Sequence, residues 1–191
     1  MAIERFIFGQ RDAFERPSSR MALRGWSGAI CLFLIAAASP GVAGDRLRQG
    51  MSAAAAHNYV RAAEIFLPLA ANGDARAQSY LGFMYAHGQG VPQNYMVSAG
   101  WYRCAADQGF ANAQYMLGLM YDKGQGVPKD YVMAYTWLNL AVAGAGPERE
   151  RWIPVRNAIL SKLTLVERQS AQILAFSGPP PAPCLPIPFG Y

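Results

Sequence analysis

The sequence repeats itself at an offset of 36 residues, and this period constrains the fold more than any other feature. Residues 77–95 read AQSYLGFMYAHGQGVPQNY and residues 113–131 read AQYMLGLMYDKGQGVPKDY, with 12 of the 19 positions identical. Tyr59, Tyr95 and Tyr131 keep the same spacing. Periods of about 20–50 residues are typical of stacked supersecondary units, each of which buries its apolar face against its neighbours. The repeat therefore predicts a solenoid rather than a closed enzyme fold.

Each repeat predicts two helices, A and B, joined by a glycine-rich loop. On a helical wheel, Leu81, Met84 and Tyr85 share one face of helix A with Ala77, and Gly82 admits the close approach of a neighbouring helix. The loop proline ends helix A, and a short polar residue then caps helix B. The expected elements are helix A at 75–87 and 111–123, loops at 88–92 and 124–128, caps Asn94 and Asp130, and helix B at 95–108 and 131–143.

The flanking segments complete an all-α fold, a short right-handed α/α solenoid of about two and a half repeats with a C-terminal helical cap. Gly144-Ala-Gly-Pro147 interrupts the repeat, and Thr164-Leu-Val-Glu167 is a capping box that begins a last helix. Six prolines make the tail extended. The expected parts are a lead-in at 45–57, repeats at 58–146 with a first helix at 59–71, a helical cap at 147–176 and a proline-rich tail at 177–191.

The N-terminus has the order of a secretory signal. A basic lead from Met21 precedes the apolar run AICLFLIAAA, and small residues follow it up to Gly44, so we expect cleavage near residue 43 or 44. The signal is complete from Met21, which makes residues 1–20 an expected artefact of an upstream start codon. This signal predicts that the protein is periplasmic or secreted. An uncleaved inner-membrane anchor at residues 25–44 is the alternative.

Composition argues against several functional classes. The net charge of +5 is spread along the chain without a basic stripe, so nucleic-acid binding is not expected. No metal-ligand spacing, phosphate loop or nucleophile motif occurs, so we expect no catalytic residue, metal or cofactor. Cys104 and Cys184 are either two unpaired thiols or, in an oxidising compartment, a disulfide.

One face of the A helices is free to vary. Packing positions such as Leu81 and Leu117 are identical between the repeats, whereas the opposite positions differ in chemistry. This division is expected when stacking determines one face and the other recognises a protein or peptide; an ordinary solvated face is the simpler interpretation. The candidate binding residues on this concave face are Arg76, Ser79, Phe83 and Ala86 in the first repeat and Asn112, Tyr115, Leu119 and Asp122 in the second.

The motif A-Q-x-x-L-G-x-M-Y-x-x-G-x-G-V-P-x-[ND]-Y at 77–95 and 113–131 resembles the Sel-one-like repeat, a relative of the tetratricopeptide repeat. The resemblance covers about residues 58–146. It implies an α/α solenoid that serves as an adaptor for other macromolecules, and some members are secreted to the periplasm. The family has no shared catalytic motif.

These observations predict a non-catalytic protein-interaction module of the bacterial cell envelope, an adaptor, scaffold or regulator that binds a protein or peptide through the concave face of its helix pairs. The alternative is a weak envelope hydrolase acting on cell-wall or β-lactam substrates. That enzyme needs a nucleophile and a base, and the sequence contains no recognisable pair.

Overall fold

The computed structural model describes residues 40–180. The predicted segment 1–20, most of the predicted signal peptide at 21–44 and the end of the tail lie outside this range. Within it the chain forms eight α-helices and no strand, so the all-α prediction is confirmed. None of these helices is long and apolar enough to cross a membrane. They are α1 (Pro40–Ala55), α2 (Tyr59–Ala71), α3 (Ala75–His87), α4 (Tyr95–Asp107), α5 (Ala111–Lys123), α6 (Tyr131–Gly144), α7 (Arg149–Leu160) and α8 (Leu165–Ser177).

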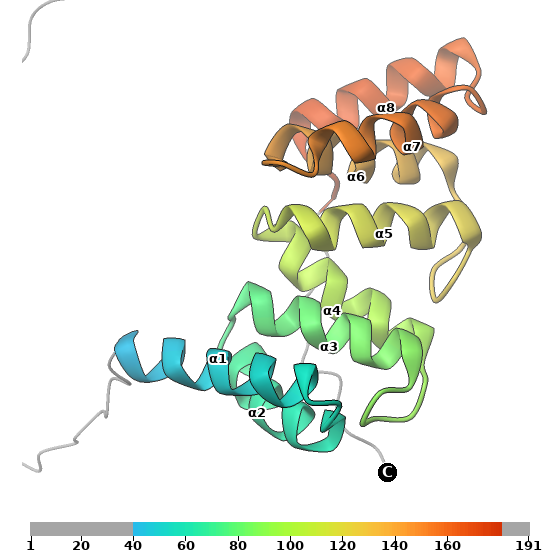
Figure 1. Cartoon of the computed structure of the whole chain (residues 1–191). Coiled ribbons are helices and arrows are strands. Elements are labelled where there is room, and N and C mark those ends of the chain that lie inside the picture. The colour runs from blue at the N-terminus through green and yellow to red at the C-terminus, as the bar shows by residue number, and fades with distance from the viewer. Residues whose placement is uncertain (1–39, 181–191) are drawn as a thin grey trace, which may run out of the picture. The chain divides into compact units, whose positions relative to one another are not determined.

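The helices form a stack in chain order. Each helix from α1 to α6 packs against the next one, and α7 and α8 both pack against α6 (Figure 1). Helices α3 and α5 are the predicted A helices, and α4 and α6 are the B helices. The predicted helical-repeat solenoid is therefore confirmed for the described residues.

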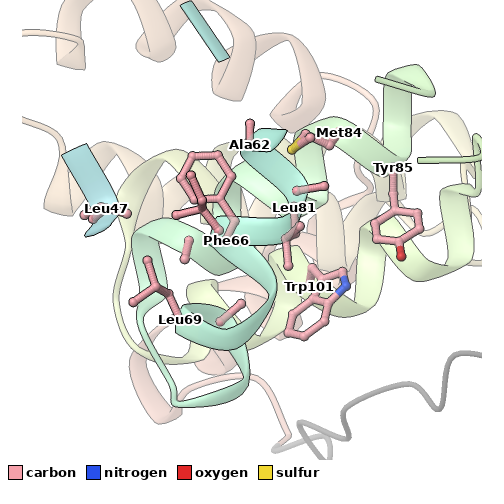
Figure 2. Close-up of a cluster of buried hydrophobic side chains, with 12 residues drawn as sticks. Leu47, Ala62, Phe66, Leu69, Leu81, Met84, Tyr85 and Trp101 are labelled. Atoms are coloured by element: carbon pink, nitrogen blue, oxygen red, sulfur yellow. The ribbon is translucent and has the colours of Figure 1, made fainter. Parts of the chain in front are cut away.

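The core consists of consecutive clusters along the stack. The first cluster joins α1 to α4 and includes Leu47, Phe66, Leu81 and Trp101 (Figure 2). Further clusters follow around α4 to α6 and then around α6 to α8. Each helix pair thus buries its apolar side chains against its neighbours, as in other solenoids.

A buried glutamine fastens each A helix to the end of the preceding B helix. The side-chain amide of Gln78 donates to the carbonyl of Ala70 at 3.1 Å, and Gln114 donates to Ala106 at the same distance. Both carbonyls lie in the last turn of a helix, where no intrahelical donor remains. Each of these carbonyls also accepts a backbone N–H, from Gly73 and from Gly109. The glutamine of the repeated Ala-Gln motif therefore adds a side-chain bond that ties each A helix to the end of the preceding helix.

A helical glycine lets each A helix contact its own B helix closely. A Cβ atom on Gly82 would lie 2.8 Å from the ring of Tyr102, and one on Gly118 would lie 2.7 Å from Leu138. Real Cβ atoms do not approach other heavy atoms so closely. The predicted close approach at Gly82 is confirmed, and it brings Tyr102 against the backbone of α3.

The second glycine of each loop lies against the preceding B helix. Gly90 and Gly126 have φ values of 71° and 72°, a left-handed conformation that favours glycine. A Cβ atom at Gly90 would collide with the backbone of Tyr59, and one at Gly126 would collide with the backbone of Tyr95. These contacts are 36 residues apart, so the two loops dock in the same way.

Most helix limits agree with the sequence analysis. Asn94 and Asp130 cap α4 and α6, and the capping box of Thr164 and Glu167 is present. Helix α1 begins at Pro40 rather than near Asp45. Proline is well suited to the first position of a helix, because it has no N–H group to leave unsatisfied there.

Cys104 is disulfide-bonded. The other two cysteines, Cys31 and Cys184, lie outside the described residues, so the pairing with Cys184 stays a prediction. The guanidinium of Arg103 donates to the carbonyl of Pro180. This bond brings the chain close to α4 only four residues before Cys184, which favours that pairing.

We expect Gly126→Ala to destabilise the fold more than Gly124→Ala. Both glycines have positive φ, so both variants lose about 1–2 kcal/mol of unfolding free energy from backbone strain. At Gly126 the new methyl group would collide with the backbone of Tyr95, whereas at Gly124 the nearest backbone atoms, of Lys129, are at ordinary contact distance. The overpacking at Gly126 adds about 1–3 kcal/mol. Urea unfolding followed by circular dichroism measures the difference, and equal losses would contradict the docking of the loop.

Mass spectrometry of a non-reduced digest should identify a peptide that joins Cys104 to Cys184. Cys184→Ala should then lower the free energy of unfolding by about 2–4 kcal/mol, since the disulfide no longer restricts the unfolded chain. A digest in which Cys104 is joined to Cys31 would contradict the prediction.

Candidate protein-binding groove

A groove of about 460 Å³ lies between α3 and α5, and we call it the A-helix groove. Its floor comes from the B helix between them, and α1 closes one side. The two A helices contribute residues at equivalent positions of the repeat. The lining residues are Met51 from α1, Arg76, Ser79, Tyr80 and Phe83 from α3, Tyr102 from α4, Phe110 at the cap of α5, and Asn112, Tyr115 and Met116 from α5.

Stacked rings support the walls of the groove. Tyr80 stacks on Phe66 with ring centroids 4.8 Å apart, and Tyr115 stacks on Trp152 at 4.7 Å. Phe66 and Trp152 are buried in the core. The two tyrosine rings are therefore held in place before a ligand arrives, which reduces the entropy lost on binding.

Tyr102 forms the floor and is only 1% exposed. Its ring rests on α3 because Gly82 has no side chain. Burial raises the pKa of the Tyr102 phenol well above its ordinary value, so the hydroxyl keeps its proton. No residue between 40 and 180 forms a hydrogen bond with this hydroxyl, which leaves it available as a donor to a bound group.

Polar groups line one part of an otherwise apolar groove. Arg76 is exposed and is the one charged residue among those that line the groove, and Ser79 and Asn112 add a hydroxyl and an amide. Phe83 is 40% exposed and lies beside His87, with ring centroids 4.2 Å apart. An apolar groove with a few polar groups is typical of a ligand site.

The structure brings five of the eight predicted residues into this groove, namely Arg76, Ser79, Phe83, Asn112 and Tyr115. The other three are not part of its lining. Ala86 and Leu119 are half-buried, and the carboxylate of Asp122 pairs with the ammonium of Lys162 at 2.6 Å. Whether the eight residues bind a partner remains a prediction.

Sequence reasoning did not identify the other half of the groove. Tyr80 and Met116 occupy equivalent positions that differ between the repeats, directly after Ser79 and Tyr115. The difference in residue type between these two positions is a signal from which the sequence could have predicted them as part of the open face. Met51, Tyr102 and Phe110 come from outside the A helices, so the helical wheel gave no indication of them.

The groove contains no evident catalytic pair. Ser79 is its one aliphatic hydroxyl, and no histidine, aspartate or glutamate is among the lining residues to activate it. Across residues 40–180, no three metal-ligating side chains gather into a metal site. The geometry therefore suits non-covalent binding.

The fold and the groove define a helical-repeat protein with an open face between consecutive A helices. The family model of the Sel1 repeat matches residues 75–110 and 111–144. The two matched segments are the two units that the sequence motif predicted. Sel1 repeats are commonly protein-interaction modules. The comparison with curated proteins finds no match.

Two solved structures agree with this assignment. The protective antigen c5321 of uropathogenic Escherichia coli, described as displaying an SLR fold, is 32% identical with a TM-score of 0.65; the match covers 71% of this chain and 29% of that one. A Sel1 repeat protein from Oxalobacter formigenes is 34% identical with a TM-score of 0.52, covering 56% of this chain and 43% of that one. The chain thus matches less than half the length of either protein.

Alkaline pH should weaken the fold partly through Tyr102. The raised pKa means that unfolding releases its proton above the ordinary tyrosine pKa of about 10. The contribution of Tyr102 to the free energy of unfolding is therefore fully present below that pH. It decreases as the pH rises further, by up to about 1.4 kcal/mol per pH unit. Urea unfolding at pH 8 and pH 11 should therefore show a smaller loss for Tyr102→Phe than for the wild type. Equal losses would contradict the buried phenol.

Proposed function

We propose that the A-helix groove binds an extended segment of a partner protein, and that the chain is a non-catalytic adaptor of the bacterial cell envelope. The observation that carries the proposal is the groove between α3 and α5, with aromatic side chains in its lining. The lining residues of the A helices differ between the two repeats, whereas packing positions such as Leu81 and Leu117 are identical. A solenoid provides such a groove because each unit contacts only its neighbours and leaves one face open.

The lining favours a segment that presents an apolar or aromatic side chain. Tyr80 and Tyr115 are pre-positioned platforms, and Met116 supplies a flexible side chain that adapts to the ligand. The Tyr102 hydroxyl is a donor suited to a carbonyl of the bound segment. The positive charge of Arg76 favours an acidic group nearby over a basic one.

The envelope location is supported by the N-terminal sequence. The basic lead, apolar run and small residues between Met21 and Gly44 match a secretory signal. A disulfide at Cys104 suits an oxidising compartment outside the cytoplasm. The membrane-anchored alternative gives the same groove and differs only in the fate of residues 25–44.

Site-specific photocrosslinking in native envelopes tests the proposal. A photoreactive residue at Ser79, inside the groove, should capture a partner that one at Met96 does not. Met96 is 73% exposed on α4, outside the groove, and serves as the matched control. Mass spectrometry then identifies the captured segment, which can be synthesised as a peptide.

Phe83→Ala and Tyr115→Ala should each weaken binding of that peptide by about tenfold or more, as expected for aromatic anchors. Met96→Ala should leave the affinity unchanged, and circular dichroism confirms that each variant is folded. Identical capture from Ser79 and Met96, or unchanged affinity in both groove variants, would contradict the groove.

A further inference from the structure

The outer face of α8 carries a row of exposed apolar side chains. Leu165, Val166, Ile173 and Phe176 are 77%, 72%, 67% and 97% exposed, and we call them the α8 stripe. They are four of the nine large apolar side chains that are exposed among residues 40–180. A single helix therefore holds almost half of them, and such a concentration marks an interaction site rather than scattered surface residues.

Helix geometry places the stripe opposite the side that packs on α6. At about 100° per residue, Val166, Ile173 and Phe176 lie on the far side of α8 from Ala171. Ala171 is fully buried. The helix is thus apolar on two opposite faces, whereas the terminal element of a solenoid normally turns a polar face to water.

The stripe is also free of charge. The two charged residues of α8 are Glu167 and Arg168. At about 100° per residue, Glu167 projects nearer to Ala171 than to the stripe, and Arg168 lies midway between Ala171 and Leu165. The carboxylate of Glu167 accepts the N–H and hydroxyl of Thr164, each at 2.8 Å. Arg168 donates to the carbonyl of Leu163 at 3.1 Å. Glu167 is exposed and Arg168 is half-buried, but neither lies among Val166, Ile173 and Phe176 on the helix surface.

We propose that the α8 stripe binds the α8 stripe of a second copy of this chain, with the two helices antiparallel about a twofold axis. The apolar residues are placed at both ends of the helix, with Gln169 between them. An antiparallel arrangement sets Leu165 and Val166 of one copy near Ile173 and Phe176 of the other. The two Gln169 amides meet near the axis, where each can donate to and accept from the other.

Charge favours a second copy over other occupants. A twofold contact sets the same surface against itself, so any charge within it meets a like charge. The chain has a net charge of +5, and an uncharged face is where two copies repel each other least. A helix that lies on an anionic membrane normally carries several basic residues toward the lipid headgroups, and α8 has one, which is held inward.

The size of the stripe determines the strength of the contact. One face of a helix of 13 residues is smaller than the roughly 800 Å² per partner of a standard interface. The dimer is therefore weak and in exchange with the monomer. It leaves the A-helix groove open, because none of the groove's lining residues belongs to α8.

Sedimentation equilibrium of the purified full chain over a range of concentrations tests the contact. The wild type should fit a monomer–dimer equilibrium, and Ile173→Glu should raise its dissociation constant at least about tenfold, because the contact would bury an unpaired charge. Met96→Glu, at an exposed apolar residue of α4, should leave the constant unchanged. Circular dichroism confirms that both variants are folded.

A matched pair of cysteine variants locates the axis. Under mild oxidation Gln169→Cys should form a dimer linked through residue 169, and Ser170→Cys, on another side of the same helix, should form much less. Wild-type protein that stays monomeric at every concentration would overturn the proposal. So would equal weakening by Ile173→Glu and Met96→Glu, equal crosslinking of the two cysteines, or binding of the stripe to phosphatidylglycerol vesicles without self-association.

Discussion

The contact between the second loop glycine of each repeat and the preceding B helix sets the spacing of the stack. Gly90 lies against Tyr59 and Gly126 lies against Tyr95, so each loop reaches back across a repeat and docks backbone against backbone. Any side chain at these positions would separate the layers. The same contact made twice, 36 residues apart, is what makes consecutive A helices equivalent in position.

This spacing produces the groove. The intervening B helix holds α3 and α5 apart, and the A-helix groove lies between them. Tyr102 forms the floor of the groove, with its ring against the backbone of Gly82. The stacked pairs that Tyr80 and Tyr115 form with buried rings hold the walls. Tyr80, Tyr102 and Tyr115 therefore line the groove and also pack against the core of the stack.

The sequence was sufficient to predict the helix pairs and their caps, because the period of 36 and the Gly-x-Gly-Val-Pro loop are local signals. It also placed Arg76 and Tyr115 on the open face. It could not place Tyr102 in the groove, since that residue reaches it only through the packing of α4 on α3. Nor could it show that α8 presents a second apolar face outward, because an apolar pattern on both sides of a helix does not say which side packs inward.

Nuclear Overhauser effects between two pairs of protons test the docking of the loops most directly. The structure places the α position of Gly90 next to the amide of Val60, and that of Gly126 next to the amide of Met96. We expect strong effects from the α protons of Gly90 and Gly126 to those two amides. The presence of one effect without the other, or the absence of both in the folded protein, would contradict a stack built by repeating one contact.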